Sequence, residues 1–224
     1  MSSAAVASAV PPLPLWRTSP ARVARLVVGL WVFGTGDALL VASQLGNSPW
    51  TVFAEGLSLH TPLTIGASTI VISLAIFAIW VPLRVRPGLG TVLNVIVIGI
   101  AIDVTLLLVD TPGSLIARGL LLGGGIALIG AGSGLYLGTA HGPGPRDGLM
   151  TGLHRATGRP VSLVRGAIEV TALTIGWLLG GTLGIGTVTF ALLIGPAVQL
   201  GLAADARWRA AASRRQEPLS APTR

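Results

Sequence analysis

Two stretches of this chain recur in the same order, and their spacing limits the folds it can adopt. The first half contains GNSPWTVFAEGL at 46–57 and GLGTVLNVIVIGIA at 88–101. The second half contains GPGPRDGLMTGL at 142–153 and GIGTVTFALLIGPA at 184–197, so each position has an equivalent 96 residues later. A duplicated unit of this length predicts two halves of similar structure.

The composition excludes a soluble domain. Apolar residues make up 51% of the chain and charged residues 10%, whereas a soluble domain carries about 25% charged residues. The absence of cysteine excludes disulfides, thiolate nucleophiles and cysteine-based metal sites. All 15 basic residues are arginine, and they gather at the ends of apolar segments. This placement is typical of membrane topology and argues against a nucleic-acid partner.

Six apolar stretches are long enough to cross the hydrocarbon core of a lipid bilayer. A core about 30 Å thick takes roughly 17–25 helical residues. We therefore predict an all-α membrane protein with six transmembrane helices. The expected spans are Leu26–Ser43, Leu63–Val81, Thr91–Val109, Gly119–Ala140, Val161–Gly181 and Gly184–Ala204.

The arginines predict the orientation of these spans. They concentrate in both tails, in the loop after the second span and in the loop after the fourth span. The positive-inside rule then puts both termini in the cytoplasm. We expect a cytoplasmic tail at 1–25, three spans in repeat 1 at 26–110, three in repeat 2 at 111–204, and a second tail at 205–224. Because three is odd, the two repeats should insert with opposite orientation.

A short helix is expected after a proline between the first and second spans of each repeat. Pro49 and Pro145 suit the first helical position, with Ser48 and Gly144 at the N-cap. Each segment can reach about 15 Å, half of a bilayer. Two interpretations stay open: half-helices that form a gate with their positive ends toward a solute, or amphipathic connectors at the membrane surfaces.

Small residues predict close helix packing. Gly130, Gly134 and Gly138 form a ladder in the fourth span, and Gly34 and Ala38 begin its counterpart in the first. We expect these ladders to let the first and fourth spans cross. Gly34 and Gly36 also match Gly132 and Gly134 at a slightly longer spacing than the main repeat.

Few charges fall within the spans, and each is a candidate for a pathway. A carboxylate costs at least about 2.5 kcal/mol at the bilayer centre, so Asp37 and Asp103 should face a partner or a wet cavity. For Asp37 we favour a functional role. Arg165 and Glu169 lie one turn apart, and we favour a structural ion pair for them. We identify no metal site, no cofactor site and no catalytic cluster, and so expect no enzyme activity.

Several segments together resemble a known family. These are GPGPRDGLM at 142–150, VRGAIE at 164–169, WLLGGTLGIGT at 177–187 and IGPA at 194–197, with GNSPW and PGLGT in the first half. They resemble the YczE-like family of bacterial integral membrane proteins (the YczE, YyaS and YitT type). The resemblance implies a multi-pass protein of the bacterial cytoplasmic (inner) membrane and supplies no substrate. It places a site on Pro145, Arg146, Asp147, Arg165 and Glu169, near the cytoplasmic side.

Two functions remain. The first is a small transporter or channel that moves an unknown small solute or ion through the inverted repeats. The second is a membrane scaffold or regulator that acts through a partner protein. A homodimer is compatible with either function.

Overall fold

The computed structural model describes residues 19–216, and side chains are described through residue 211. This part of the chain forms eight helices and contains no strand. Six of the helices are long and apolar enough to cross a membrane. In chain order the helices are α1 (Pro20–Ser43), α2 (Pro49–Ser58), α3 (Ile65–Leu83), α4 (Leu89–Leu108), α5 (Leu115–Leu137), α6 (Pro145–Thr157), α7 (Val161–Leu178) and α8 (Ile185–Gln216).

Two helices extend into segments that we predicted as tails. Helix α1 begins at Pro20 because proline suits the first helical position and the Ser19 side chain caps the Arg22 amide. Helix α8 continues to Gln216. Asp205 pairs there with Arg25 and, at 3.0 Å, with Arg209. Both helices are therefore longer than the spans predicted for them, and the remainder of each tail lies outside the described residues.

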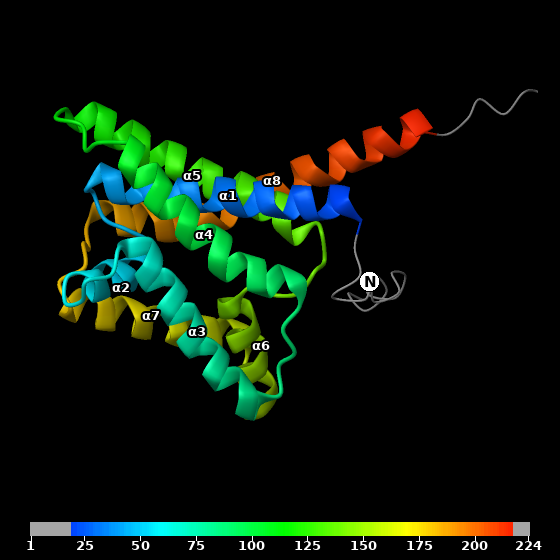
Figure 1. Ribbon diagram of the computed structural model, residues 1–224, viewed down its shortest axis with the longest axis horizontal. Coiled ribbons are helices and arrows are strands. Elements are labelled where there is room, and N and C mark those ends of the chain that lie inside the picture. The colour runs from blue at the N-terminus through cyan, green and yellow to red at the C-terminus, as the bar shows by residue number, and fades with distance from the viewer. Residues whose placement is uncertain (1–18, 217–224) are drawn as a thin grey trace, which may run out of the picture.

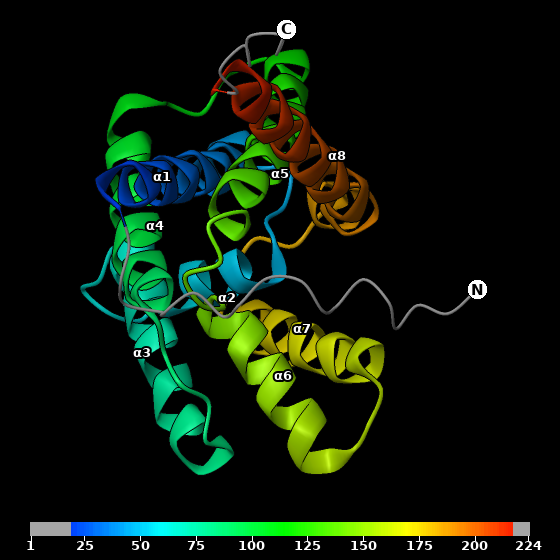
Figure 2. The same ribbon diagram turned by 90° about the vertical axis from the view of Figure 1, so that its right-hand side faces the viewer.

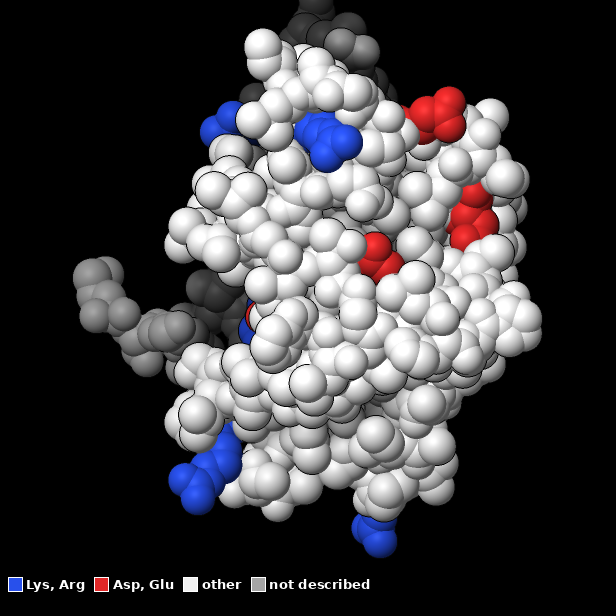
Figure 3. All heavy atoms as spheres, turned by 90° about the vertical axis from the view of Figure 1, so that its left-hand side faces the viewer, with Lys and Arg blue, Asp and Glu red and all other residues white. Residues whose placement is uncertain are grey.

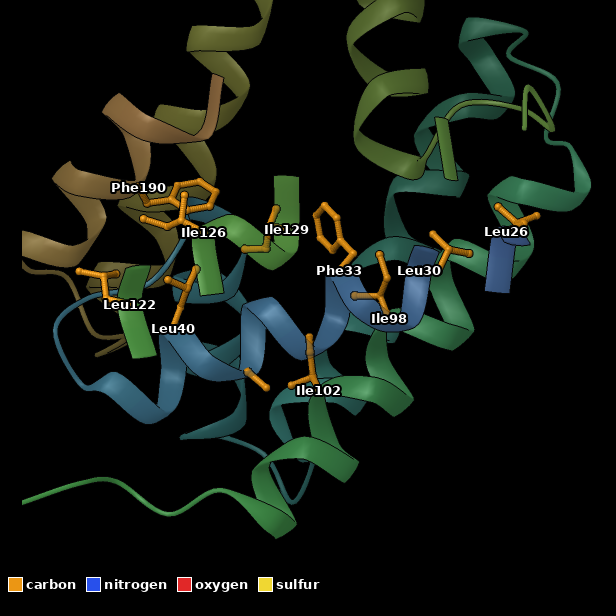
Figure 4. Packing of buried hydrophobic residues seen from close by; sticks show 11 residues of the cluster. Leu26, Leu30, Phe33, Leu40, Ile98, Ile102, Leu122, Ile126, Ile129 and Phe190 are labelled. Carbon is orange, nitrogen blue, oxygen red and sulfur yellow. The ribbon is translucent and has the colours of Figure 1, made fainter. Parts of the chain in front are cut away.

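The helices form two groups, which Figures 1 and 2 show from two directions. Helices α1, α4, α5 and α8 make up one group, and α2, α3, α6 and α7 the other. Helix α1 and its equivalent α5 lie side by side and run antiparallel, while α1 begins and α8 ends on the same side of the molecule. Figure 4 shows the core of the first group, a single cluster to which α1 contributes Leu30 and Leu40, α4 contributes Ile102, and α5 contributes Ile129.

Glycines bring α1 and α5 into backbone contact. A methyl group on Gly36 would lie 2.7 Å from the carbonyl oxygen of Gly125, and the converse distance is the same. Gly29 and Gly132 meet in the same way. In the repeat Gly29 is equivalent to Gly125 and Gly36 to Gly132, so the crossing is self-complementary. The contacts of Gly36 therefore follow the spacing of the main repeat and not the longer spacing that we assigned to this residue.

The predicted ladders pack elsewhere. Gly34 lies against Ile98 and Ala101 of α4, while Gly130 and Gly134 lie against α8. Ala38 is buried, and Gly138 lies beside the Arg25–Asp205 pair. The first and fourth spans do pack together, but the assignment of this contact to the ladders was wrong. In both ladders the glycines face the third span of their own repeat, and a different face of each helix makes the crossing.

Unusual backbone conformations recur at the repeat spacing. Positive φ angles occur at Gln44 (53°) and Ala140 (56°), and at Gly46 (121°) and Gly142 (108°). Each of these loops accepts a backbone hydrogen bond from the start of the last span of the other half. The Gly90 amide donates to the His141 carbonyl at 2.9 Å, and the Gly186 amide donates to the Leu45 carbonyl at 2.7 Å.

Candidate functional site

The N-terminal end of α2 lies against a carboxylate in the C-terminal half of α1. Asp37 is 4% exposed, and its Oδ1 accepts a hydrogen bond from Thr51 Oγ1 at 3.2 Å. Ser48, the N-cap of α2, lies 2.8 Å from the same Thr51 hydroxyl. The positive end of α2 and two hydroxyls therefore hold the Asp37 carboxylate inside the first half. The candidate residue on α1 and the candidate cap thus belong to one site.

The N-terminal end of α6 brings Arg146 to the same region. Its guanidinium carbon lies 5.7 Å from the ring centroid of Trp50 and 5.9 Å from that of Phe33. Within the described residues it forms no ion pair and no hydrogen bond. Arg146 is also the charged group whose field acts on Asp37. A cation held by aromatic faces and free of a carboxylate partner is available to a solute.

Two cavities meet at Arg146. The smaller has a volume of about 50 Å³ and lies between Asp37 and Arg146. Its further lining residues are Trp50, Thr51, Thr69, Ile72, Ser73, Ile76, Asn94, Ile98 and Pro145. The larger has a volume of about 430 Å³, which is in the range of small-molecule sites. Its polar lining consists of Asn94, Ser133, Tyr136, Arg146, Asp147, Arg165 and Glu169.

The two cavities are built from equivalent residues. Asp37 of the smaller corresponds to Ser133 of the larger, and Trp50 corresponds to Arg146. Thr69 and Ser73 correspond to Arg165 and Glu169, which pair at 3.0 Å as their spacing predicts. The charges implied by the family resemblance therefore line the larger cavity.

The other candidate carboxylate is placed differently. Asp103 accepts hydrogen bonds from the Thr64 hydroxyl at 2.6 Å and from the Gly66 amide at 2.8 Å. It therefore caps the start of α3 and does not line either cavity. Of the two surroundings expected for Asp103, a partner or a wet cavity, the structure shows polar partners, because backbone and hydroxyl donors satisfy its carboxylate.

A buried network that we missed joins α2 to the loop before α8. Glu55 accepts hydrogen bonds from Asn47 Nδ2 at 2.8 Å, from the Thr182 amide at 2.6 Å and from the Thr182 hydroxyl at 2.8 Å. The equivalents of Glu55 and Asn47 are Thr151 and Pro143, so the second half lacks this network. The sequence marks Glu55 only by its place in the expected post-proline helix, because its partner Thr182 lies far away along the chain.

The two ends of the molecule differ in helix packing. Figure 3 shows the end opposite the start of α1, where a few separate charged groups interrupt an uncharged surface. At the α2–α7 contact, a methyl group on Gly56 would lie 2.6 Å from the Gly176 carbonyl. At the equivalent α3–α6 contact, the residue corresponding to Gly176 is Trp80, whose ring lies against Gly148. A side chain thus separates α3 from α6, whereas backbones touch between α2 and α7.

His141 provides a pH-dependent test of the loop before α6. Burial lowers the pKa of His141 below its usual value of 6.5, and the charge of Arg22 lowers it further. The unfolded chain binds a proton below pH 6.5 where the folded ring stays neutral, so folding stability should decline as the pH falls through 6.5. The equivalent residue is Leu45, so His141→Leu should flatten this decline in thermal unfolding between about pH 8 and about pH 5. Parallel losses in both proteins would contradict the assignment.

Comparison with known proteins identifies the relatives of this chain. Residues 20–202 match the model of a family described as "Family of unknown function (DUF6198)". An uncharacterized protein of Haemophilus influenzae is 41% identical over 193 residues, which cover 86% of this chain and 88% of the relative. The uncharacterized membrane protein YczE of Bacillus subtilis is 34% identical over 78% of this chain and 82% of its own length. YyaS of the same organism is 29% identical over 72% and 82%, respectively.

No solved structure matches the chain. The relatives named YczE and YyaS confirm the resemblance drawn from the sequence motifs. Together with the six apolar helices, they indicate a multi-pass membrane protein.

Proposed function

The chain belongs to this family of unknown function, and we propose that it is a small transporter built from two inverted repeats around Asp37 and Arg146. Alternating access is the mechanism that we propose, with the smaller and larger cavities as the closed and open halves of one pathway. The carrying observation is that equivalent residues line two unequal cavities that meet at one unpaired arginine. No catalytic step and no cofactor are part of this proposal.

The inverted relation is supported by the contacts between the halves. Helices α1 and α5 run antiparallel and cross through glycines at equivalent positions. Each repeat also holds the start of the last helix of the other through the same backbone hydrogen bond, from Gly90 to His141 and from Gly186 to Leu45. Both contact types are those expected across a pseudo-two-fold axis, as in isologous interfaces.

The unequal cavities support two conformational states. The Glu55 network and the backbone contact between α2 and α7 close one half, while Trp80 keeps α3 and α6 apart in the other. If the halves exchanged conformations, the smaller cavity would open and the larger would close. Asp37 and Arg146 would then face alternate sides without moving far.

The sides of the membrane follow from the charges. With both termini in the cytoplasm of the inner membrane, the larger cavity opens inward, because it includes the last turn of α5 and the first half of α7. The Glu55 network then forms the outer gate. In this proposal the structure corresponds to the inward-open state of the transporter.

Single cysteines can test this mechanism, since the natural chain has none. Met150 lines the larger cavity, and its equivalent Ala54 is 1% exposed. In membrane vesicles, Met150→Cys should react with an impermeant maleimide from the cytoplasmic side, and Ala54→Cys should not react from either side. Adding Glu55→Ala should open the outer gate, so that Ala54→Cys becomes reactive from outside and Met150→Cys loses reactivity.

A matched control is Asp110→Ala, an exposed acidic residue in the α4–α5 loop. It should leave both labelling rates unchanged. Equal and opposite changes in the two cysteines would support alternating access. An increase in both would indicate a channel-like opening, and no change in a folded Glu55→Ala variant would favour a scaffold that acts through a partner.

A further inference from the structure

The polar groups beside the N-terminus of the short helix differ between the two halves, and the difference indicates a class of ligand. In the first half, the protein supplies a carboxylate there: Asp37 receives a hydrogen bond from Thr51, beside the Ser48 cap. In the second half, the equivalent of Asp37 is Ser133, and the equivalent of Ser48 is Gly144. Gly144 provides no side-chain cap. The carboxylate that occupies the first site therefore has no counterpart on α5.

The second site has the donors for such a group. Ser133 is 3% exposed and lines the larger cavity, and its hydroxyl makes no hydrogen bond within the described residues. The Asn94 amide lines the same cavity and is likewise without a partner there. Trp50 Nε1, beside Arg146, is buried and has no acceptor. A buried donor without a partner is costly, so a bound acceptor would stabilise this region.

The charge and shape of the larger cavity limit the class of ligand that it can bind. The guanidinium of Arg146 can bind a carboxylate through two parallel hydrogen bonds, and the free amides of the first α6 turn add to the attraction. The rest of the cavity is largely apolar, with Phe33, Ile129 and Phe190 on its wall. An organic group attached to the carboxylate would pack there.

We infer that the larger cavity binds a small organic carboxylate, whose charged group takes, on Arg146 and α6, the place that Asp37 takes on α2. This inference rests on the proposed transport function and names its substrate class. Asp147 on the same turn and Glu169, paired with Arg165, also line the cavity. Asp147 opposes the ligand charge, and its neutralisation should therefore tighten binding.

The test uses the full chain in phosphatidylcholine nanodiscs with three aromatic probes of similar size. Benzoate is an anion, benzamide is neutral and benzylamine is a cation. Calorimetry should detect saturable binding of benzoate alone, with a matching change in tryptophan fluorescence that Trp50→Phe reduces. Arg146→Gln should weaken benzoate binding at least about a hundredfold, and Asp147→Asn should strengthen it.

Ser133 provides the sharpest variant pair. Ser133→Asp introduces a carboxylate at the position equivalent to Asp37, and it should abolish benzoate binding by occupying Arg146. Ser133→Asn has nearly the same size without the charge and should retain binding. Retained benzoate binding in a folded Ser133→Asp or Arg146→Gln variant would overturn the inference.

Other outcomes also decide the question. Binding of benzylamine in place of benzoate, equal binding of inorganic phosphate, or no binding of benzoate would each overturn the carboxylate assignment. Displacement of benzoate by phosphatidylglycerol in the nanodisc would assign the site to a lipid headgroup and would overturn it as well. The labelling of Met150→Cys and Ala54→Cys is independent of these probes, so failure of the substrate class and failure of the transport mechanism can be told apart.

Discussion

Arg146→Gln is expected to abolish benzoate uptake into proteoliposomes. Arg146 is the one charge that lines both cavities and forms no ion pair within the described residues. Its removal leaves a carboxylate ligand without a counterion and leaves Asp37 without its nearest compensating charge. Charge-assisted hydrogen bonds contribute about 1.5–3 kcal/mol each, so loss of a two-bond contact should reduce uptake by at least about a hundredfold.

The controls separate this effect from general damage. Arg146→Lys keeps the charge but not the planar pair of donors, and it should retain part of the uptake. Arg155→Gln removes a charge from an exposed position of the same helix and should leave uptake unchanged. Wild-type uptake by a folded Arg146→Gln protein would exclude Arg146 from the pathway.

The largest effect on stability is expected at the crossing of α1 and α5. Gly125→Val would place side-chain atoms against the carbonyl oxygen of Gly36, which is backbone and can move only if the helices separate. Overpacking costs typically about 1–3 kcal/mol, and the rigid neighbour puts this site at the upper end. Thermal unfolding in detergent micelles should show a clear loss of stability.

The adjacent glycine is a matched control. Gly124 lies in the same helix, and a side chain there would meet nothing within 4 Å. Gly124→Val changes helix propensity by the same amount as Gly125→Val and should have little further effect. Equal unfolding temperatures for the two variants would contradict the assigned crossing, as the difference between them measures only the contact with α1.

The sequence was sufficient where the structure depends on local or periodic features. Six apolar stretches predicted six spans because hydropathy alone determines which segments can cross a bilayer. The post-proline helices begin at Pro49 and Pro145, since proline and its preceding residue act within one turn. The pair of Arg165 and Glu169 followed from helical spacing.

Other features were decided by contacts between distant segments. Asp37 and Asp103 look alike along the chain, yet one lies beside a cavity and the other caps α3. Glu55 lies in a buried network because Thr182, far away in sequence, supplies two of its donors. Such partners cannot be identified from composition or from the spacing of residues along the chain.

The amino-acid sequence was enough to establish a repeated pattern of apolar helices, long enough to cross a membrane and with few charges inside them. It did so because the repeat, the hydropathy and the proline positions act locally. Contacts between distant segments were needed to establish which glycines form the crossing, which carboxylate lines a cavity together with Arg146, and that the two equivalent cavities differ in volume. Those outcomes depend on how two similar halves pack against each other, and on single differences at that interface such as Trp80 at the position equivalent to Gly176.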